Sequence, residues 1–231
     1  MNMRNLLALI AVAMVTFPFP AQSSGTDGSN AANKTAAAGS TVEILGNGVS
    51  GGSNSMSATV LATSIKTSPP QDLLFTVSLE CALWTTVKTV GNDVSESTSR
   101  VTVTVFFDGN MVPISSDDAD GSVVFCDRTH QQSTSGFDDE NATIKQYLAT
   151  RTANAFSWVL PNVGGGTHSV EVVAELSGTA TDNAFTQAGI GHRTLVVEPV
   201  HLAQGATVTN TAPAASHGAT ATTSLLWGSA F

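Results

Sequence analysis

The densest group of possible metal ligands is an acidic stretch between residues 117 and 140, which holds seven of the 18 acidic residues. Asp117, Asp118 and Asp120 stand in close order within the sequence DDADG. Ca²⁺ takes six to eight oxygen ligands from loops of this kind. The spacing is not that of an EF-hand, because no Glu stands at the twelfth position. We favour a turn in which Asp side chains bond the backbone, and we keep these three aspartates as a calcium site in the alternative.

Catalytic chemistry has weaker candidates. Glu171 and Glu175 lie four residues apart on one expected strand, so their carboxylates are about 13 Å apart. Glycosidase pairs are about 5–9.5 Å apart, which favours solvated strand charges instead. His130, His168 and His192 fall near strand ends, and three imidazoles could hold a catalytic Zn²⁺ only if the fold brought them together. The chain has no G-x-S-x-G elbow, H-E-x-x-H motif or Walker loop, so we expect no enzyme activity.

Aromatic side chains could build a sugar platform if they are exposed. Phe156 and Trp158 share the phase of Leu160, which favours core packing for both. Trp84 is out of phase with the apolar residues between Leu73 and Leu83, so it is expected on the opposite face of its strand. Trp84 is therefore the candidate binding aromatic, with a glycan or an unknown protein as the ligand.

The elements that must position these residues are strands, because apolar residues alternate with polar ones through most of the middle of the chain. Asp108-Gly109-Asn110 predicts a tight hairpin turn, and Pro161-Asn162 and Gly164–Gly166 predict a second break. The expected strands lie near residues 56–65, 73–83, 101–107, 111–114, 122–129, 154–160, 168–176 and 190–197, with 42–45 as a possible edge strand.

Only Ala142–Thr150 (ATIKQYLAT) has a helical pattern, and it is short. Helical segments between strands are otherwise missing, which argues against a parallel α/β sheet. The sequence therefore predicts an all-β fold, an antiparallel β-sandwich with one short helix and disordered flanks.

The segment Asn162–Val172 (NVGGGTHSVEV) resembles the penultimate hairpin of bacterial extracellular immunoglobulin-like and fibronectin-III-like domains, in which a Gly-rich turn leads into a strand of the form G-x-H-x-V-x-V. The resemblance covers about forty residues. Trp84 follows Cys81 by three residues, whereas antibody domains place the tryptophan on the next strand. The resemblance implies an immunoglobulin-like sandwich that acts in adhesion, as a spacer or in ligand binding.

The two ends differ from the middle. Residues 1–23 have the layout of a signal peptide, with Arg4, the apolar stretch Leu6–Val15 and small residues before Ser24. Residues 24–40 are expected to be a flexible lead-in, 41–200 the β-sandwich domain, and 201–231 a low-complexity tail with an apolar end. Leu225, Leu226, Trp227 and Phe231 at that end form a packing strand or a docking segment for another subunit.

The expected export of the chain favours a disulfide bond between its two cysteines, because exported proteins fold in an oxidising compartment. In an exported chain with exactly two cysteines, Cys81 and Cys126 are expected to form a disulfide bond, since both have the apolar phase of a strand. Closing a loop of 45 residues stabilises the folded state by roughly 4 kcal/mol in the chain-entropy model.

Composition limits the partners. Charged residues make up 12% of the 231, and 18 acids against 9 bases give a net charge of −9. This balance argues against nucleic acid and anionic membranes, which need clustered Lys and Arg. No apolar run reaches the 18–20 residues of a membrane span, so none is expected in the mature chain.

Together these observations predict an exported, acidic, non-enzymatic binding or structural module at the cell surface or secreted. Three alternatives stay open. A carbohydrate-binding module requires exposed aromatics. A β-sandwich hydrolase requires a site with paired carboxylates or clustered histidines. A self-assembling subunit would insert its apolar tail into a neighbour as an added strand.

Overall fold

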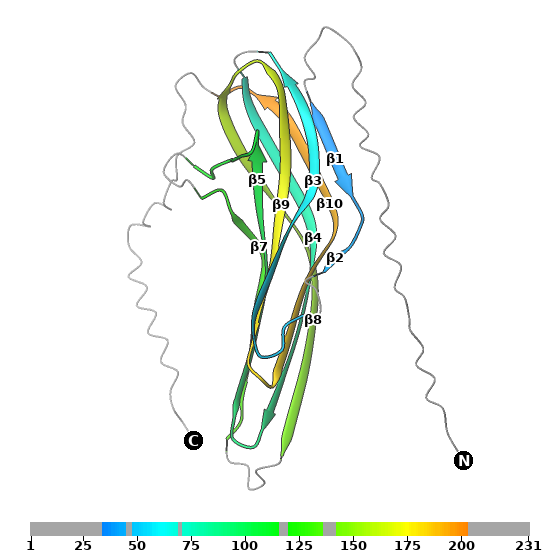
Figure 1. Ribbon diagram of the computed structural model, residues 1–231, viewed down its shortest axis with the longest axis vertical. Coiled ribbons are helices and arrows are strands. Elements are labelled where there is room, and N and C mark those ends of the chain that lie inside the picture. The colour runs from blue at the N-terminus through cyan, green and yellow to red at the C-terminus, as the bar shows by residue number, and fades with distance from the viewer. Residues whose placement is uncertain (1–33, 45–47, 69–70, 116–119, 136–141, 203–231) are drawn as a thin grey trace, which may run out of the picture.

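The computed structural model describes residues 34–44, 48–68, 71–115, 120–135 and 142–202. Within these ranges the chain forms ten strands and no helix (Figure 1). The strands are β1 (Thr35–Gly39), β2 (Glu43–Ile44), β3 (Gly52–Thr67), β4 (Gln71–Val90), β5 (Val94–Phe107), β6 (Asn110–Met111), β7 (Val123–Ser133), β8 (Thr143–Val163), β9 (Gly166–Ala180) and β10 (Ala184–Val200).

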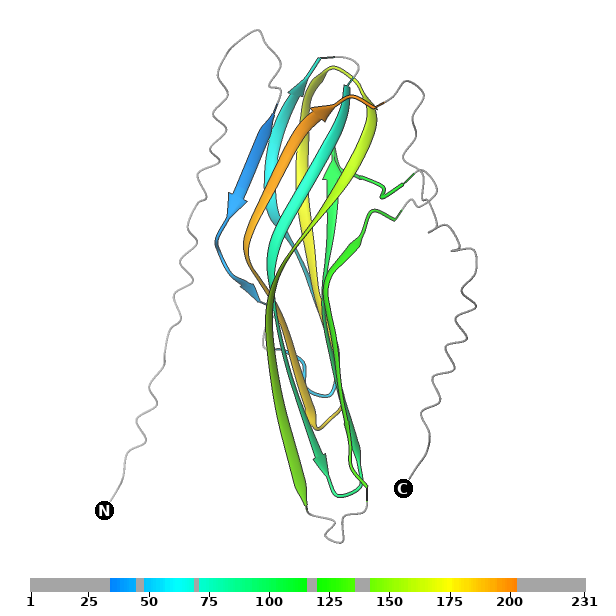
Figure 2. The ribbon, with the colours of Figure 1, turned by 180° about the vertical axis from the view of Figure 1, so that it is seen from behind.

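The strands form two antiparallel sheets that pack face to face as a β-sandwich. Sheet A has the order β1-β10-β4-β8, with β2 also on β10. Sheet B has the order β3-β9-β5-β6, with β7 also on β5. Figure 2 shows the same two layers from behind, with β1, β10, β4 and β8 in front. All-β architecture and antiparallel pairing are as the sequence predicts.

The strand order is that of a jelly roll, in which the chain crosses between sheets at nearly every step. An immunoglobulin sandwich instead has strands ABED in one sheet and CFG in the other, with sequential neighbours paired. The immunoglobulin-like subtype is therefore not the one observed. β8 and β9, which the resemblance treats as a hairpin, lie in different sheets.

Two expectations about individual segments are corrected. Ala142–Thr150, expected as a helix, lies in β8 from Thr143 onward and pairs with β4. The β-branched residues Thr143, Ile144 and Thr150 suit a strand, and pairing along the whole of β4 outweighs a weak local helical pattern. Thr35–Gly39 forms β1 against β10, so the sandwich begins inside the segment expected to be a flexible lead-in.

The predicted hairpin at Asp108-Gly109 is present and joins β5 to β6. Asp108 has φ 49° and Gly109 has φ 77°. Positive φ at both central residues is the mark of the tight turn that matches strand twist. Asp and Gly are among the residues that adopt this conformation most readily.

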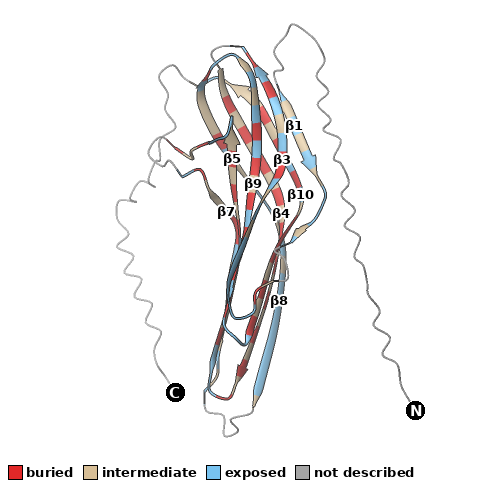
Figure 3. Ribbon diagram, viewed as in Figure 1, coloured by how far each residue is buried: buried red, intermediate tan, exposed pale blue. Residues whose placement is uncertain are grey.

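Buried residues follow the strands of both sheets (Figure 3), and the kind of buried side chain changes along the sandwich. The end that holds the first half of β4, which we call the apolar half, packs large side chains such as Phe75, Leu79 and Trp158. The other end, which we call the polar half, mixes small hydroxyl residues with small apolar ones such as Val87 and Ala184. The buried hydroxyl residues there are Thr85, Thr89, Ser95, Ser97, Ser99 and Thr186.

The disulfide bond between Cys81 and Cys126 lies where the two halves meet and joins β4 of sheet A to β7 of sheet B. On β4, Leu79 precedes Cys81 on the inner face, and Thr85 follows it four residues later. The predicted pairing is confirmed, and its place shows its structural use. It ties the sheets together at the level where large apolar contacts give way to small ones.

The sheets approach closely in the polar half. A Cβ atom built on Gly178 of β9 would lie 2.6 Å from Cγ2 of Thr186 on β10, and 3.2 Å from the carbonyl oxygen of Thr98. Only a residue without a side chain fits there. The small interior residues therefore allow the two sheets to lie close together in the polar half.

Arg193 ties one edge of the sandwich together. Its buried guanidinium donates to the backbone carbonyls of Val60, Thr41 and Gly191 and to the hydroxyl of Thr41. Burial lowers the pKa of Arg193, and Glu43 opposes this effect. The side chain follows a bulge in the β10–β4 pairing between Ile190 and Arg193, which turns it inward.

Among the described residues, no helix is long and apolar enough to cross a membrane.

Candidate functional site

The outer face of sheet A carries three aromatic residues in two adjacent rows. Trp84 on β4 lies between Gln187 of β10 and Ala149 of β8. Two residues further along, Thr86 lies between Phe185 of β10 and Tyr147 of β8. Diagonal neighbours on one sheet face are about 7–8 Å apart, so both other aromatics are within reach of Trp84. We call Trp84, Tyr147 and Phe185 the aromatic face.

Trp84 lies over the backbone of the neighbouring strand. A Cβ atom on Gly189 would lie 3.0 Å from Cζ3 and 3.3 Å from Cη2 of Trp84. The missing side chain at Gly189 therefore makes room for the benzo ring of the indole. Trp84 is half-buried. It lies on the outer face of its strand, as its position out of phase with the apolar residues predicts.

The other two aromatics differ in exposure. Tyr147 is 62% exposed, the highest value among the three. Phe185 is half-buried under the backbone of Gly48, where a Cβ atom would lie 2.5 Å from the phenyl ring. Gly48 has φ 76°, so both its conformation and the space favour glycine. Trp84 and Tyr147 are thus the pair open to a ligand.

Charged groups lie on the same face, four residues from Trp84 along β4. Arg151 of β8 forms a two-pronged ion pair with Glu80, and His192 of β10 lies 3.1 Å from the Glu80 carboxylate. Arg151 first and His192 second lower the pKa of Glu80 to about 2. The carboxylate is therefore ionised at any physiological pH, which suits hydrogen bonding and excludes a general acid.

A shallow depression of about 560 Å³ adjoins Glu80. Its lining includes Ser78, Glu80 and His192 together with small residues of neighbouring strands, Ala38, Gly39, Ala153 and Thr194. Charged and hydroxyl groups therefore border a floor of small side chains. The depression and the aromatic face lie on one continuous outer surface of sheet A.

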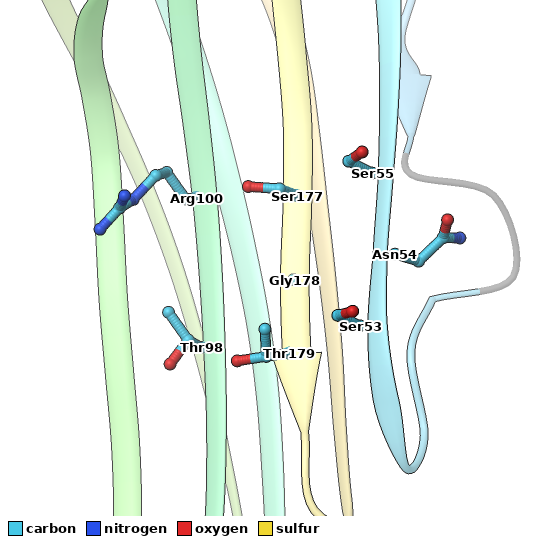
Figure 4. Close-up of a pocket in the computed structure, with 8 residues that line it drawn as sticks. All are labelled: Ser53, Asn54, Ser55, Thr98, Arg100, Ser177, Gly178 and Thr179. Atoms are coloured by element: carbon cyan, nitrogen blue, oxygen red, sulfur yellow. The ribbon is translucent and has the colours of Figure 1, made fainter.

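A second depression of about 530 Å³ lies on the outer face of sheet B in the polar half (Figure 4). It is lined by Ser53, Asn54, Ser55, Thr98, Arg100, Ser177, Gly178 and Thr179. Arg100 forms an exposed ion pair with Asp127, 2.7 Å apart. The lining holds no aromatic residue and is mostly polar, whereas ligand sites are lined predominantly by apolar and aromatic side chains.

The structure does not bring the three candidate zinc histidines together. His130 is buried between Thr85 and Gln146 in the polar half. His168 bonds Asp108 at the β5–β6 turn, and His192 bonds Glu80 on the outer face of sheet A. Each imidazole has its own partners on different elements. Among the described residues, no three His, Cys, Asp or Glu side chains are grouped to hold a metal.

His168 takes part in an arrangement with the residue types of a hydrolase triad. Its Nδ1 lies 2.7 Å from Asp108, and its Nε2 lies 3.1 Å from the hydroxyl of Thr67. Thr67 is 4% exposed, and its hydroxyl donates to the carbonyl of Gly164 at 2.6 Å. A nucleophile must reach its substrate, so this buried hydroxyl is poorly suited. The cluster instead joins the end of β3, the β5–β6 turn and the start of β9.

The remaining acidic candidates are separate. Glu171 and Glu175 are exposed on the outer face of sheet B, as solvated strand charges would be. Asp120 accepts a hydrogen bond from the backbone of Ser122 at 2.9 Å, and this bond lowers its pKa. Asp117 and Asp118 lie outside the described residues. The tail residues Leu225, Leu226, Trp227 and Phe231 also lie outside them.

Sequence reasoning did not bring the members of this surface together. Tyr147 lies in the segment expected to be a helix, and the strand pairing with Thr86 is what places it beside Trp84. The ion pair of Glu80 with Arg151 joins residues 71 positions apart. Alternation indicates the faces of Glu80 and Trp84 on β4, but the order of strands within sheet A has no local signal.

Comparisons with known proteins find no matching family model and no matching curated protein. Among solved structures, the chain is similar to the carbohydrate-binding module TmCBM61 in complex with β-1,4-galactotriose, with 11% identity and a TM-score of 0.22, over 70% of this chain and 86% of that one. It is also similar to Eiger TNF from S. frugiperda, with 10% identity and a TM-score of 0.19, over 74% and 96%. Scores this low carry no argument about function.

Proposed function

We propose that this protein is an exported, non-enzymatic β-sandwich protein that binds glycans on the outer face of sheet A. The observation that carries the proposal is the juxtaposition of Trp84 and Tyr147 in adjacent rows, one half-buried and one 62% exposed. The apolar C–H face of a pyranose ring packs on an aromatic ring. The hydroxyls at the edge of the pyranose then remain free to bond polar side chains nearby.

Polar groups stand where a bound sugar would need them. Gln187 is the direct neighbour of Trp84, and Arg151 is one row away beside Ala82. Their amide and guanidinium groups can bond hydroxyl oxygens. Ligand sites typically combine an apolar surface with a few polar groups that fix orientation.

The proposal includes that the protein is exported and that it binds its ligand without catalysing a reaction. The signal-like N-terminus and the Cys81–Cys126 disulfide support an oxidising compartment. The hydrolase alternative requires paired carboxylates or clustered histidines. The candidate histidines among the described residues lie apart, and the Thr67 hydroxyl beside His168 is buried, so binding is the better supported activity.

The decisive experiment compares glycan binding by the wild type, Trp84→Ala and Tyr147→Ala on a panel of immobilised neutral and acidic polysaccharides. Phe106→Ala is the matched control, because Phe106 is a half-buried aromatic on the outer face of sheet B. We expect Trp84→Ala to weaken binding at least tenfold, since aromatic contacts dominate such sites. Tyr147→Ala should weaken binding less, and Phe106→Ala should leave it unchanged.

Circular dichroism and the intact disulfide show that each variant is folded. A wild type that binds no polysaccharide on the panel contradicts the proposal. Equal losses in Trp84→Ala and Phe106→Ala contradict it as well, because the effect would then come from general destabilisation.

A further inference from the structure

The starting point is the unusual exposure of β8 in the polar half. All residues from Thr143 to Ala149 are exposed, although β8 is paired with β4 along this whole stretch. Three large apolar side chains are exposed here within five residues. They are Ile144 at 36%, Tyr147 at 62% and Leu148 at 45%. β8 is the last strand of sheet A, so its outer edge has no partner strand among the described residues.

Two of these exposed apolar residues lie on the inner face of sheet A. Ile144 lies opposite Thr89, and Leu148 lies opposite Thr85. Both threonines are buried in the interior, with 1% and 0% exposure. Directly paired residues share a sheet face, so Ile144 and Leu148 have the inner phase and are nevertheless exposed. Among the described residues, the interior is therefore open along this edge.

The facing strand β7 has unmet hydrogen-bonding groups at the same place. Nη1 of Arg128 and Oε1 of Gln132 are buried without a partner. Both residues lie on the inner face of β7, on either side of His130, which contacts Gln146 of β8 at 3.2 Å. Buried polar atoms in native proteins are usually paired, so these two atoms leave hydrogen-bonding capacity unused at this edge. We call Ile144, Gln146, Leu148, Arg128 and Gln132 the open seam.

A segment that binds the open seam must be extended. Three of its alternate residues should be apolar, small and polar, and apolar, in order to match Ile144, Gln146 and Leu148. The C-terminal segment Leu225–Phe231 has this pattern in Trp227, Ser229 and Phe231. Residues 199–231 contain no Asp, Glu, Lys or Arg, so no charge opposes burial. A bound strand also brings backbone N–H and C=O groups that can pair with a sheet edge.

Antiparallel pairing gives one register that fits every position. Phe231 is then opposite Ile144, Ser229 opposite Gln146, Gly228 opposite Tyr147, and Trp227 opposite Leu148. The polar pair can share a hydrogen bond, and an aromatic ring beside a strand glycine is a known stabilising combination.

Distance makes binding within one molecule less favourable. The backbone of Leu202 bonds Asp72. In this register Leu225 is opposite Thr150, whose partner Leu83 lies 11 residues along β4 from Asp72, so the separation is about 36 Å. The 23 steps from Leu202 to Leu225, rich in Gly, Ser, Thr and Ala, span about 26 Å on average when unstructured. Binding within one molecule therefore stretches the connecting chain beyond its average span, which lowers the effective concentration.

We propose that residues 225–231 of one molecule bind the open seam of a second copy as an added antiparallel strand on β8. The contact joins different surfaces of the two copies, so it either closes into a ring or extends into a chain of molecules. This inference does not rest on glycan binding, because Ile144, Gln146 and Leu148 have the inner phase of β8, although Gly228 would lie beside Tyr147 of the aromatic face.

The test is disulfide trapping between two different full-length variants. Gln146→Cys and Ser229→Cys chains are mixed under a mild oxidant, and only contact between molecules can join them. The matched control replaces Gln146→Cys with Ser157→Cys, another exposed position on β8, eleven residues away. We expect a cross-linked dimer with Gln146→Cys at least ten times more abundant than with Ser157→Cys. Adding Leu148→Glu to the Gln146→Cys chain should reduce the product severalfold.

Light scattering on the full chain and on a chain ending at residue 224 gives a second measurement. We expect the mass of the full chain to rise with concentration and the shortened chain to stay monomeric. Equal cross-linking at residues 146 and 157, or none at either, overturns the proposal. Cross-linking only within a chain that carries both cysteines also overturns it, because the segment would then bind its own molecule.

Discussion

At the scale of single residues, the clearest lesson comes from Asp108. The sequence marks it as a turn residue, and it does adopt φ 49° in the β5–β6 turn. Its carboxylate also bonds His168 at 2.7 Å and the backbone N–H of Ser169 at 2.8 Å. His168, followed by Ser169, lowers the pKa of Asp108, although burial opposes them. A turn residue is therefore also an electrostatic link to β9.

This link predicts a pH dependence for Asp108→Asn, which keeps a residue tolerant of positive φ and removes the charge. Because folding lowers the pKa of Asp108, its contribution to stability is present above the unfolded value of about 3.9 and is lost as pH falls through the folded value. The side chain is 44% exposed, so we expect a modest loss of about 1–3 °C in Tm at pH 6.

The difference between wild type and Asp108→Asn should shrink as the pH is lowered from 6 to 2, as measured by thermal unfolding at each pH. A difference that stays constant over this range would show that the carboxylate contributes nothing beyond the turn.

At the scale of elements, β4 and the first half of β8 show what alternation can and cannot tell. The inner residues of β4 from Leu73 to Leu83 were assigned correctly because every second residue there is apolar. The pattern in residues 142–150 does not alternate in this way, since both faces of β8 are exposed there. The strand exists because β4 offers a long edge for pairing, and that edge is far away in sequence.

The close approach of β9 and β10 gives a prediction at this scale. Gly178→Ala should destabilise the fold by about 1–3 kcal/mol, because the added Cβ meets Cγ2 of Thr186 at 2.6 Å. Thr186→Ser removes that methyl group and should recover at least half of the loss in the double variant. Chemical denaturation of the four proteins measures this coupling.

The contact with the Thr98 carbonyl stays at 3.2 Å in the double variant, so full recovery is not expected. Purely additive effects of the two substitutions would mean that the sheets move apart to admit the methyl group.

At the scale of the whole molecule, the sandwich is elongated and uneven (Figure 3). Large apolar contacts hold the apolar half, while the polar half depends on small side chains, a narrow gap and the disulfide at its border. In the polar half, Oγ1 of Thr89, Oγ of Ser97 and Oγ1 of Thr186 are buried without a protein partner. Apolar burial is the main favourable term in folding, so the polar half should open more easily.

Replacing both cysteines by serine tests this gradient. We expect the free energy of unfolding to fall by up to roughly 4 kcal/mol, from the 45-residue loop that is no longer closed. Amide hydrogen exchange should accelerate first in residues 85–99 and 123–133, and later in 73–79 and 101–107. A uniform acceleration along all four segments would show that the two halves unfold as one unit.

The all-β class, the tight turn and the disulfide could be predicted from the amino-acid sequence, because strand alternation, turn residues and cysteine pairing are local or nearly local properties. Leu73–Leu83 alternates through its own side chains, Asp108-Gly109 turns through its own backbone preferences, and Cys81 had only Cys126 as a partner. These features needed no knowledge of which strands lie side by side.

The jelly-roll order of the strands could not be predicted from local patterns, and both proposed binding surfaces depend on that order. Trp84 and Tyr147 are 63 residues apart in sequence and meet because β4 pairs with β8. The open seam exists because β8 and β7 end their sheets on the same side. Strand order is set by the total burial of the two sheets, a sum over distant contacts that no single segment of the chain records.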